Sequence, residues 1–243
     1  MAWGDYDNDG DLDIVVSGLS YDVGLSGERT DLYRNNGDGS FTRLAVGLAG
    51  LSYSAVAWAD YDRDGDLDLV VSGDELTVSA PIRTVLYRNE GAQDALAPDP
   101  ASATPRFTAV DAGLPPMTDG DLAWGDYDGD GDPDLLLTGF INSTDSALYL
   151  YRNDASPTAT GAGDGGAPLF VRVATLSPVS RGNVEWSDYD NDGDLDIVVA
   201  GNTNTGGRTA IYRNDGIVET LPQLQLVPFG IPGVSWGDVA GGF

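Results

Sequence analysis

A sixteen-residue motif occurs four times in this chain, and its recurrence limits the possible folds more than any other property. The first copy reads Trp-Gly-Asp-Tyr-Asp-Asn-Asp-Gly-Asp-Leu-Asp-Ile-Val-Val-Ser-Gly, and the four copies occupy residues 3–18, 58–73, 124–139 and 186–201. A second motif, Tyr-Arg-Asn, follows each copy in step, at residues 33–35, 87–89, 151–153 and 212–214. Two motifs in step four times indicate a repeat protein whose units share one structure.

Each unit is expected to form four short β-strands. The first strand ends at the Trp, the second follows the Asp cluster, the third ends at Tyr-Arg-Asn and the fourth follows a turn. The second strands are apolar on both faces, which favours a sheet covered on both sides. Their predicted ranges are 12–17, 67–72, 135–138 and 195–200. No helical segment of useful length is expected.

Four strands per unit, with units about 50–66 residues long, are typical of propeller blades. We therefore predict an all-β fold, a β-propeller of four-stranded blades that forms a single domain over residues 1–243. Four blades are visible, and a surplus first strand follows them at the C-terminus. The repeat starts are Trp3, Trp58, Trp124 and Trp186, with an incomplete fifth at Trp236.

Every copy of the motif contains Asp at its first, third, fifth, seventh and ninth cluster places, and Gly at the sixth. Five carboxylates within nine residues repel one another, and a bound cation would relieve that repulsion. The Asp residues are therefore predicted metal ligands. They are Asp5, Asp7, Asp9, Asp11, Asp13, Asp60, Asp62, Asp64, Asp66, Asp68, Asp126, Asp128, Asp130, Asp132, Asp134, Asp188, Asp190, Asp192, Asp194 and Asp196.

The spacing favours Ca²⁺, because Mg²⁺ takes fewer protein ligands and a stricter octahedron. The first three carboxylates converge, the sixth-place Gly permits a sharp turn, the seventh residue offers its carbonyl and the ninth Asp can bind with both oxygens. The loop is not an EF-hand, since Val or Leu occupies the twelfth place where that motif needs Glu. We predict four calcium sites with a structural role.

Composition removes several classes of function. The chain of 243 residues has 12 Arg and Lys against 39 Asp and Glu, a net charge of −27, and neither His nor Cys. Such acidity opposes binding to nucleic acid, and no apolar run is long enough for membrane insertion. His-dependent catalysis, the usual zinc sites and disulfides are excluded. No export signal is recognisable at Met1.

The core Trp-Gly-Asp-Tyr-Asp-x-Asp-Gly-Asp-x-Asp, with Tyr-Arg-Asn downstream, resembles the FG-GAP/VCBS-type repeat of integrin α-subunit propellers and many secreted bacterial proteins. The resemblance covers nearly the whole chain. It implies calcium in the hairpin between the first and second strands of each blade, held by the first, third, fifth and ninth Asp and the seventh-place carbonyl. The fifth copy departs from the pattern, because Val239 follows Asp238, so no calcium is expected there.

The Trp residues and the Tyr-Arg-Asn motifs have two interpretations. An aromatic binding track is one, but an aromatic ring in phase with every repeat favours packing between blades. The Arg is expected to pair with a nearby carboxylate.

The chain contains five first strands but four complete sets of the other three. We expect the C-terminal strand to complete a blade, either within the molecule or in a neighbouring one, because an unpaired sheet edge invites association. Loss of residues 229–243 should then change stability or assembly state.

These features predict a calcium-stabilised extracellular or cell-surface module for adhesion, attachment or self-assembly, with an unidentified protein or glycan ligand. Extracellular modules can rely on weak calcium sites. The alternative is a lectin or carbohydrate-active enzyme on the same propeller. Its catalytic pair should stand outside the repeated clusters, where Glu75 and Glu185 are the first acids to consider.

Overall fold

A computed structural model of the chain describes residues 1–22, 24, 26–75, 82–92, 105–154, 169–218 and 221–227. Regular structure within these residues consists of strands, which form four antiparallel four-stranded sheets. The all-β prediction is confirmed, and the four packed sheets are consistent with propeller blades. The described part of the chain contains no helix able to cross a membrane.

The sheets are called blades 1 to 4 in chain order, and each is a meander of four consecutive strands. Blade 1 contains β1 (Ala2–Gly4), β2 (Asp13–Ser20), β3 (Gly27–Asn35) and β4 (Phe41–Leu44). Blade 2 contains β5 (Ser52–Ala59), β6 (Asp68–Asp74), β7 (Ile82–Ala92) and β8 (Pro105–Val110). Blade 3 contains β9 (Thr118–Gly125), β10 (Asp134–Phe140), β11 (Ser146–Asn153) and β12 (Phe170–Thr175). Blade 4 contains β13 (Ser180–Ser187), β14 (Asp196–Thr203), β15 (Gly206–Val218) and β16 (Leu221–Val227).

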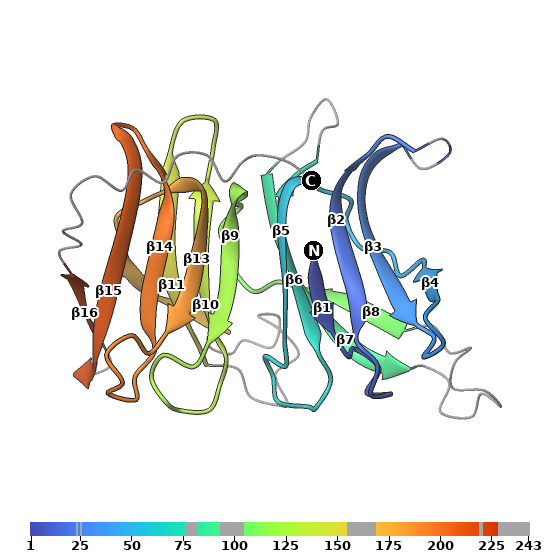
Figure 1. The fold of residues 1–243 in the computed structure, drawn as a ribbon, viewed down its shortest axis with the longest axis horizontal. Coiled ribbons are helices and arrows are strands. Elements are labelled where there is room, and N and C mark those ends of the chain that lie inside the picture. The colour runs from blue at the N-terminus through green and yellow to red at the C-terminus, as the bar shows by residue number, and fades with distance from the viewer. Residues whose placement is uncertain are drawn as a thin grey trace.

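The first two strands of every blade share one register. The motif Trp lies opposite the first apolar residue of the second strand, as in the pairs Trp58 with Leu69 and Trp186 with Ile197. The Asp cluster is therefore the hairpin loop between these strands in all four blades, and the four loops lie at the same end of the blades (Figure 1).

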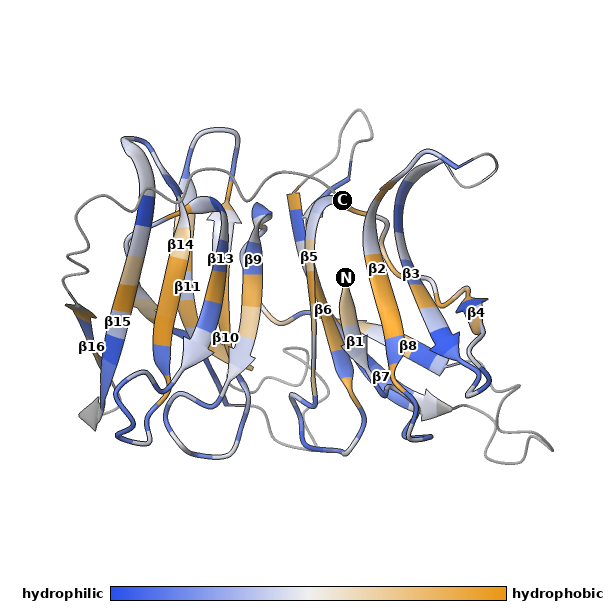
Figure 2. Cartoon of the chain, viewed as in Figure 1, coloured by the Kyte–Doolittle hydropathy of each residue, from blue (hydrophilic) through white to orange (hydrophobic). Residues whose placement is uncertain are grey.

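Apolar side chains pack between consecutive blades. One core joins blades 1 and 2 around Val15 and Val71, another joins blades 2 and 3 around Val70 and Leu135, and a third joins blades 3 and 4. Figure 2 shows these apolar segments along the second strands, with hydrophilic loops beneath them. The second strands of blades 2 and 3 are apolar on both faces because these inner blades pack against a neighbour on each side.

The motif Trp residues take part in this packing. A Cβ added to Gly4 would lie 2.8 Å from Trp58 Cδ1, and one added to Gly125 would lie 2.7 Å from Trp186 Cδ1. The Trp58 ring also stacks on Tyr6 of the preceding blade, with centroids 6.5 Å apart. Packing between blades is therefore confirmed for Trp58 and Trp186, whereas Trp236 lies outside the described residues.

Blade 1 has an uncovered face. Its twelfth-place residue Val16 is 41% exposed, whereas the equivalent Val71, Leu137 and Val199 are fully buried. Trp3 is 53% exposed and contacts Phe41 of its own blade. Blades 1 and 4 lie at opposite ends of Figure 1, so the described residues show no closed ring. The surplus strand predicted to complete a blade lies outside the described residues, and its role stays a prediction.

Candidate metal centres

Each Asp loop gathers three carboxylates. In every blade the first, third and ninth Asp of the cluster each place a carboxylate oxygen within 4.8 Å of the other two. The four triads are Asp5, Asp7 and Asp13; Asp60, Asp62 and Asp68; Asp126, Asp128 and Asp134; and Asp188, Asp190 and Asp196. These triads, one per repeat, could each hold a metal ion.

The ninth-place Asp is buried in every triad. Asp68 is fully buried at the start of β6, and its two oxygens accept hydrogen bonds from backbone N–H groups. Oδ2 accepts from Tyr61 N at 3.1 Å, and Oδ1 accepts from Asn89 N at 2.8 Å. The same two bonds recur in the other three blades. This carboxylate is therefore fixed in place by its own blade.

The loop backbone turns tightly around the first Asp. Asp60 Oδ1 and Oδ2 accept hydrogen bonds from the backbone N–H groups of Asp64 and Gly65, both at 3.0 Å. The sixth-place Gly65 has a φ of +97°, a conformation open to Gly and strained for other residues. The fourth-place Arg63 is also left-handed, with a φ of 59°, as its counterparts in the other loops are.

The fifth- and seventh-place Asp residues stand outside the triads. Asp64 Oδ1 accepts a hydrogen bond from Asp66 N at 3.0 Å, which closes a local turn. Asp66 Oδ1 accepts one from Asn8 Nδ2 of the neighbouring loop at 2.9 Å, and Asp132 pairs with Arg63 at 2.7 Å. The seventh-place side chains of blades 2 and 3 thus face the preceding loop, an arrangement compatible with their carbonyls serving as ligands. Their predicted ligation, like that of the fifth-place Asp, remains a prediction.

Burial raises the pKa of several of these carboxyl groups. Desolvation is the main cause that raises the pKa of Asp68 and Asp134 to about 8 and the pKa of Asp13 and Asp62 to about 6, although backbone N–H groups oppose it. Asp62 Oδ1 is buried and accepts no hydrogen bond among the described residues. A buried carboxylate oxygen that accepts no hydrogen bond and lies beside two other carboxylates is a suitable ligand for a hard cation.

The Asn of each Tyr-Arg-Asn motif joins one loop to the next. Asn89 donates its backbone N–H to Asp68, and its Nδ2 donates to the carbonyl of Tyr6, in the loop of blade 1, at 2.9 Å. Asn153 and Asn214 make the equivalent bonds to the loops of blades 2 and 3. Neighbouring loops are therefore coupled through one buried side chain at each interface between blades.

The Arg of the same motif pairs with an acid two residues later in blades 2 to 4. The pairs are Arg88 with Glu90, Arg152 with Asp154 and Arg213 with Asp215. The predicted pairing is confirmed there. Blade 1 has Asn36 in place of the acid.

Two features of these sites were not predicted from the sequence. The left-handed fourth place has a partial signal, since Asn and Gly tolerate that conformation and three of the four loops have one of them there, but Arg63 gives none. The linking role of Asn has no local signal, because its acceptor lies more than 80 residues earlier in the chain.

Comparison with known proteins agrees with this geometry. No curated protein matches the sequence significantly. The family model of the FG-GAP-like repeat matches residues 5–71, a stretch that begins at the first Asp of blade 1 and includes the whole Asp loop of blade 2. The resemblance read from the motif is confirmed for this stretch. Residues 5–71 of the chain are similar to an FG-GAP-like repeat.

Proposed function

We propose that the four triads bind Ca²⁺ and that the chain is a calcium-stabilised binding and structural module of the cell surface or extracellular space. The observation that carries this proposal is the fourfold recurrence of a fully buried ninth-place Asp beside two further carboxylates. Burying an uncompensated carboxylate is costly, and a divalent cation at each triad removes that cost.

The donor set supports calcium over other metals. All candidate ligands are oxygen atoms, which suit hard cations, and the loops offer backbone carbonyls in addition to three carboxylates. Sites of this kind serve a module best where calcium is abundant, which supports a location outside the cell.

Adhesion, attachment or self-assembly is the role that we propose for the module. The exposed Trp3 and Val16 on the uncovered face of blade 1 support contact with a second copy of the chain. In blades 2 to 4 the residues equivalent to Val16 are buried, and those equivalent to Trp3 are half-buried. The net charge of −27 disfavours nucleic acid as the partner.

A glycan-active enzyme is the weaker alternative. Glu75 is bonded to Arg83 at 3.0 Å, and Glu185 is exposed on β13, so neither acid stands in a paired arrangement suited to glycoside hydrolysis.

The test is thermal unfolding of metal-stripped protein with calcium, magnesium or EDTA, together with metal analysis by mass spectrometry. We expect four calcium ions per chain and a melting temperature that falls sharply in EDTA, because an ion bound only by the folded state stabilises it by mass action. Sedimentation in the same buffers reports self-association. A chain that holds no calcium and melts equally in EDTA refutes the proposal.

A further inference from the structure

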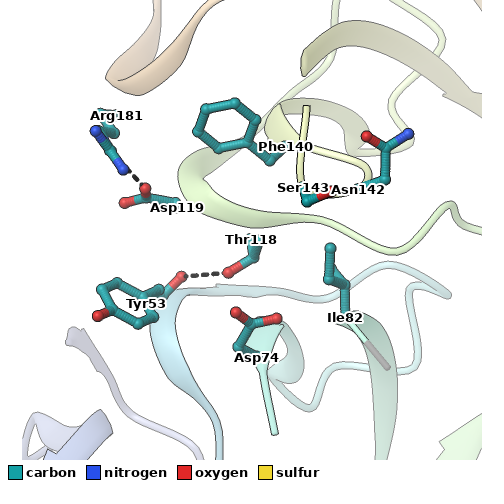
Figure 3. Close-up of a pocket in the computed structure, with 9 residues that line it drawn as sticks. All are labelled: Tyr53, Asp74, Ile82, Thr118, Asp119, Phe140, Asn142, Ser143 and Arg181. Atoms are coloured by element: carbon teal, nitrogen blue, oxygen red, sulfur yellow. Dashed lines mark hydrogen bonds and ion pairs between the residues drawn. The ribbon is translucent and has the colours of Figure 1, made fainter. Parts of the chain in front are cut away.

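A pocket of about 440 Å³ lies at the end of the blades opposite the Asp loops, and Figure 3 shows the residues that line it. Blades 2, 3 and 4 contribute to its wall, through Tyr53 on β5, Asp119 on β9 and Arg181 on β13. Each of these residues precedes the first Asp of its own loop by seven positions, which is roughly 23 Å along a strand. The pocket is therefore remote from the candidate metal centres.

Tyr53, Asp119 and Arg181 share one unusual backbone conformation. Their φ angles are 47°, 54° and 48°, in the left-handed region that residues other than Gly rarely adopt. Each lies where the pairing register between the first and second strands shifts. Bulges of this kind re-aim a side chain, and strained residues concentrate at functional sites.

The backbone around these bulges is tightly packed. A Cβ added to Gly120 would lie 1.9 Å from the carbonyl oxygen of Thr138, and one added to Gly182 would lie 2.0 Å from that of Ala200. The residue before each bulge is a buried Ser or Thr. The conformation is thus the same in three blades, while the side chains differ as a phenol, a carboxylate and a guanidinium.

These side chains provide several kinds of contact. Arg181 pairs with Asp119 at 2.7 Å and lies over the Phe140 ring, 5.8 Å from its centroid. Tyr53 is 63% exposed and offers a flat apolar surface. Asn142 adds an amide to the rim of the pocket (Figure 3).

The charges of the pocket disfavour an anionic ligand. Asp119 is balanced by Arg181, and no cation pairs with Asp74 among the described residues. An anion would meet the uncompensated carboxylate of Asp74 and the acidic chain. A ligand rich in hydroxyl groups finds acceptors in the carboxylates, donors in the guanidinium, and an aromatic face for its C–H groups.

We propose that this pocket binds a neutral saccharide, stacked on Tyr53 and hydrogen-bonded by Asp74, Asp119 and Arg181. Its volume lies within the range of small-molecule sites. The site is independent of the calcium proposal, because it shares no residue with the triads.

The test is a glycan array of neutral and acidic saccharides, probed with the labelled full chain in calcium. We expect binding to neutral glycans, reduced at least tenfold by Tyr53→Gly and by Asp119→Asn. Both variants should fold, since Gly and Asn tolerate the left-handed conformation. Tyr21→Ala, which removes an 85% exposed Tyr outside the pocket, is the matched control and should bind normally.

The proposal is overturned if the wild-type chain binds no glycan on the array, or if it binds acidic glycans alone. Equal binding by the wild type and both pocket variants does so too, because the saccharide then lies elsewhere. The melting temperature of each protein is also measured in calcium and in EDTA, so that the saccharide proposal and the calcium proposal are tested separately. A chain that loses stability in EDTA but binds no neutral glycan keeps its calcium function and loses this one.

Discussion

The two ends of the blades use the same repeat in opposite ways. At the metal end, which carries the four Asp loops, the five Asp side chains recur in all four copies, and they bond within the loop or to a neighbouring loop. At the pocket end, which carries Tyr53, Asp119 and Arg181, the backbone repeats and the side chains differ. An element that repeats in side chain and backbone supports the fold, whereas one that repeats in backbone alone is free to recognise a ligand.

The largest expected effect is at the metal end. Asp68→Asn should remove one of four calcium ions and lower the free energy of unfolding by about 4 kcal/mol when free calcium is a thousandfold above Kd. In EDTA at pH 8 the difference should shrink, because the variant no longer buries a carboxylate without a cation, while its single amide oxygen keeps only one of the two backbone hydrogen bonds of Asp68. Metal analysis and urea unfolding with and without calcium measure both effects.

Asp66→Asn is the matched control in the same loop. Its side chain faces Asn8 in an exposed bond instead of the triad, so four calcium ions and nearly full stability should remain. If the two variants lost the same amount of bound calcium and of stability, the whole cluster would act as one ligand set, and the distinction between the ninth and seventh places would be wrong.

Much of the metal end is predictable from the sequence, since periodic motifs report a local structure that each copy repeats. The second strands and the hairpin position of the Asp clusters agree with the structure, because β-branched runs and Asp-Gly turns act over few residues. The pocket was not predicted. Its residues are unlike in type, and only packing between blades 2, 3 and 4 brings Tyr53, Asp119 and Arg181 to one place.

The pH dependence of the metal-stripped protein is the next effect in size. Asp68 and Asp134 have folded-state pKa values of about 8, above the unfolded value near 4, so the folded state binds more protons between these limits. Stability should therefore fall as pH rises from about 4 to 8, by at most about 1.4 kcal/mol per pH unit for each carboxyl. Saturating calcium should flatten the profile, since the metal replaces the proton.

Melting temperatures at pH 5.5 and pH 8, recorded without metal and with calcium, measure this dependence. Asp68→Asn removes one of the titrating groups and should reduce the slope of the metal-free profile. Metal-free stability that rises over the same interval would show that Asp68 and Asp134 do not carry raised pKa values, and the electrostatic argument for their triads would fail.

The smallest effect tests whether neighbouring loops support one another. Asn89→Ala removes a buried hydrogen bond to the Tyr6 carbonyl of blade 1 and should cost about 1–3 kcal/mol. Asn35→Ala in blade 1 is the control, because its Nδ2 bonds only within its own blade, to Leu12 O in an exposed position, among the described residues. It should cost less than about 1 kcal/mol. Urea unfolding in saturating calcium measures the free energy of unfolding of both variants. Equal decreases would show that the Asn of the Tyr-Arg-Asn motif supports only its own loop.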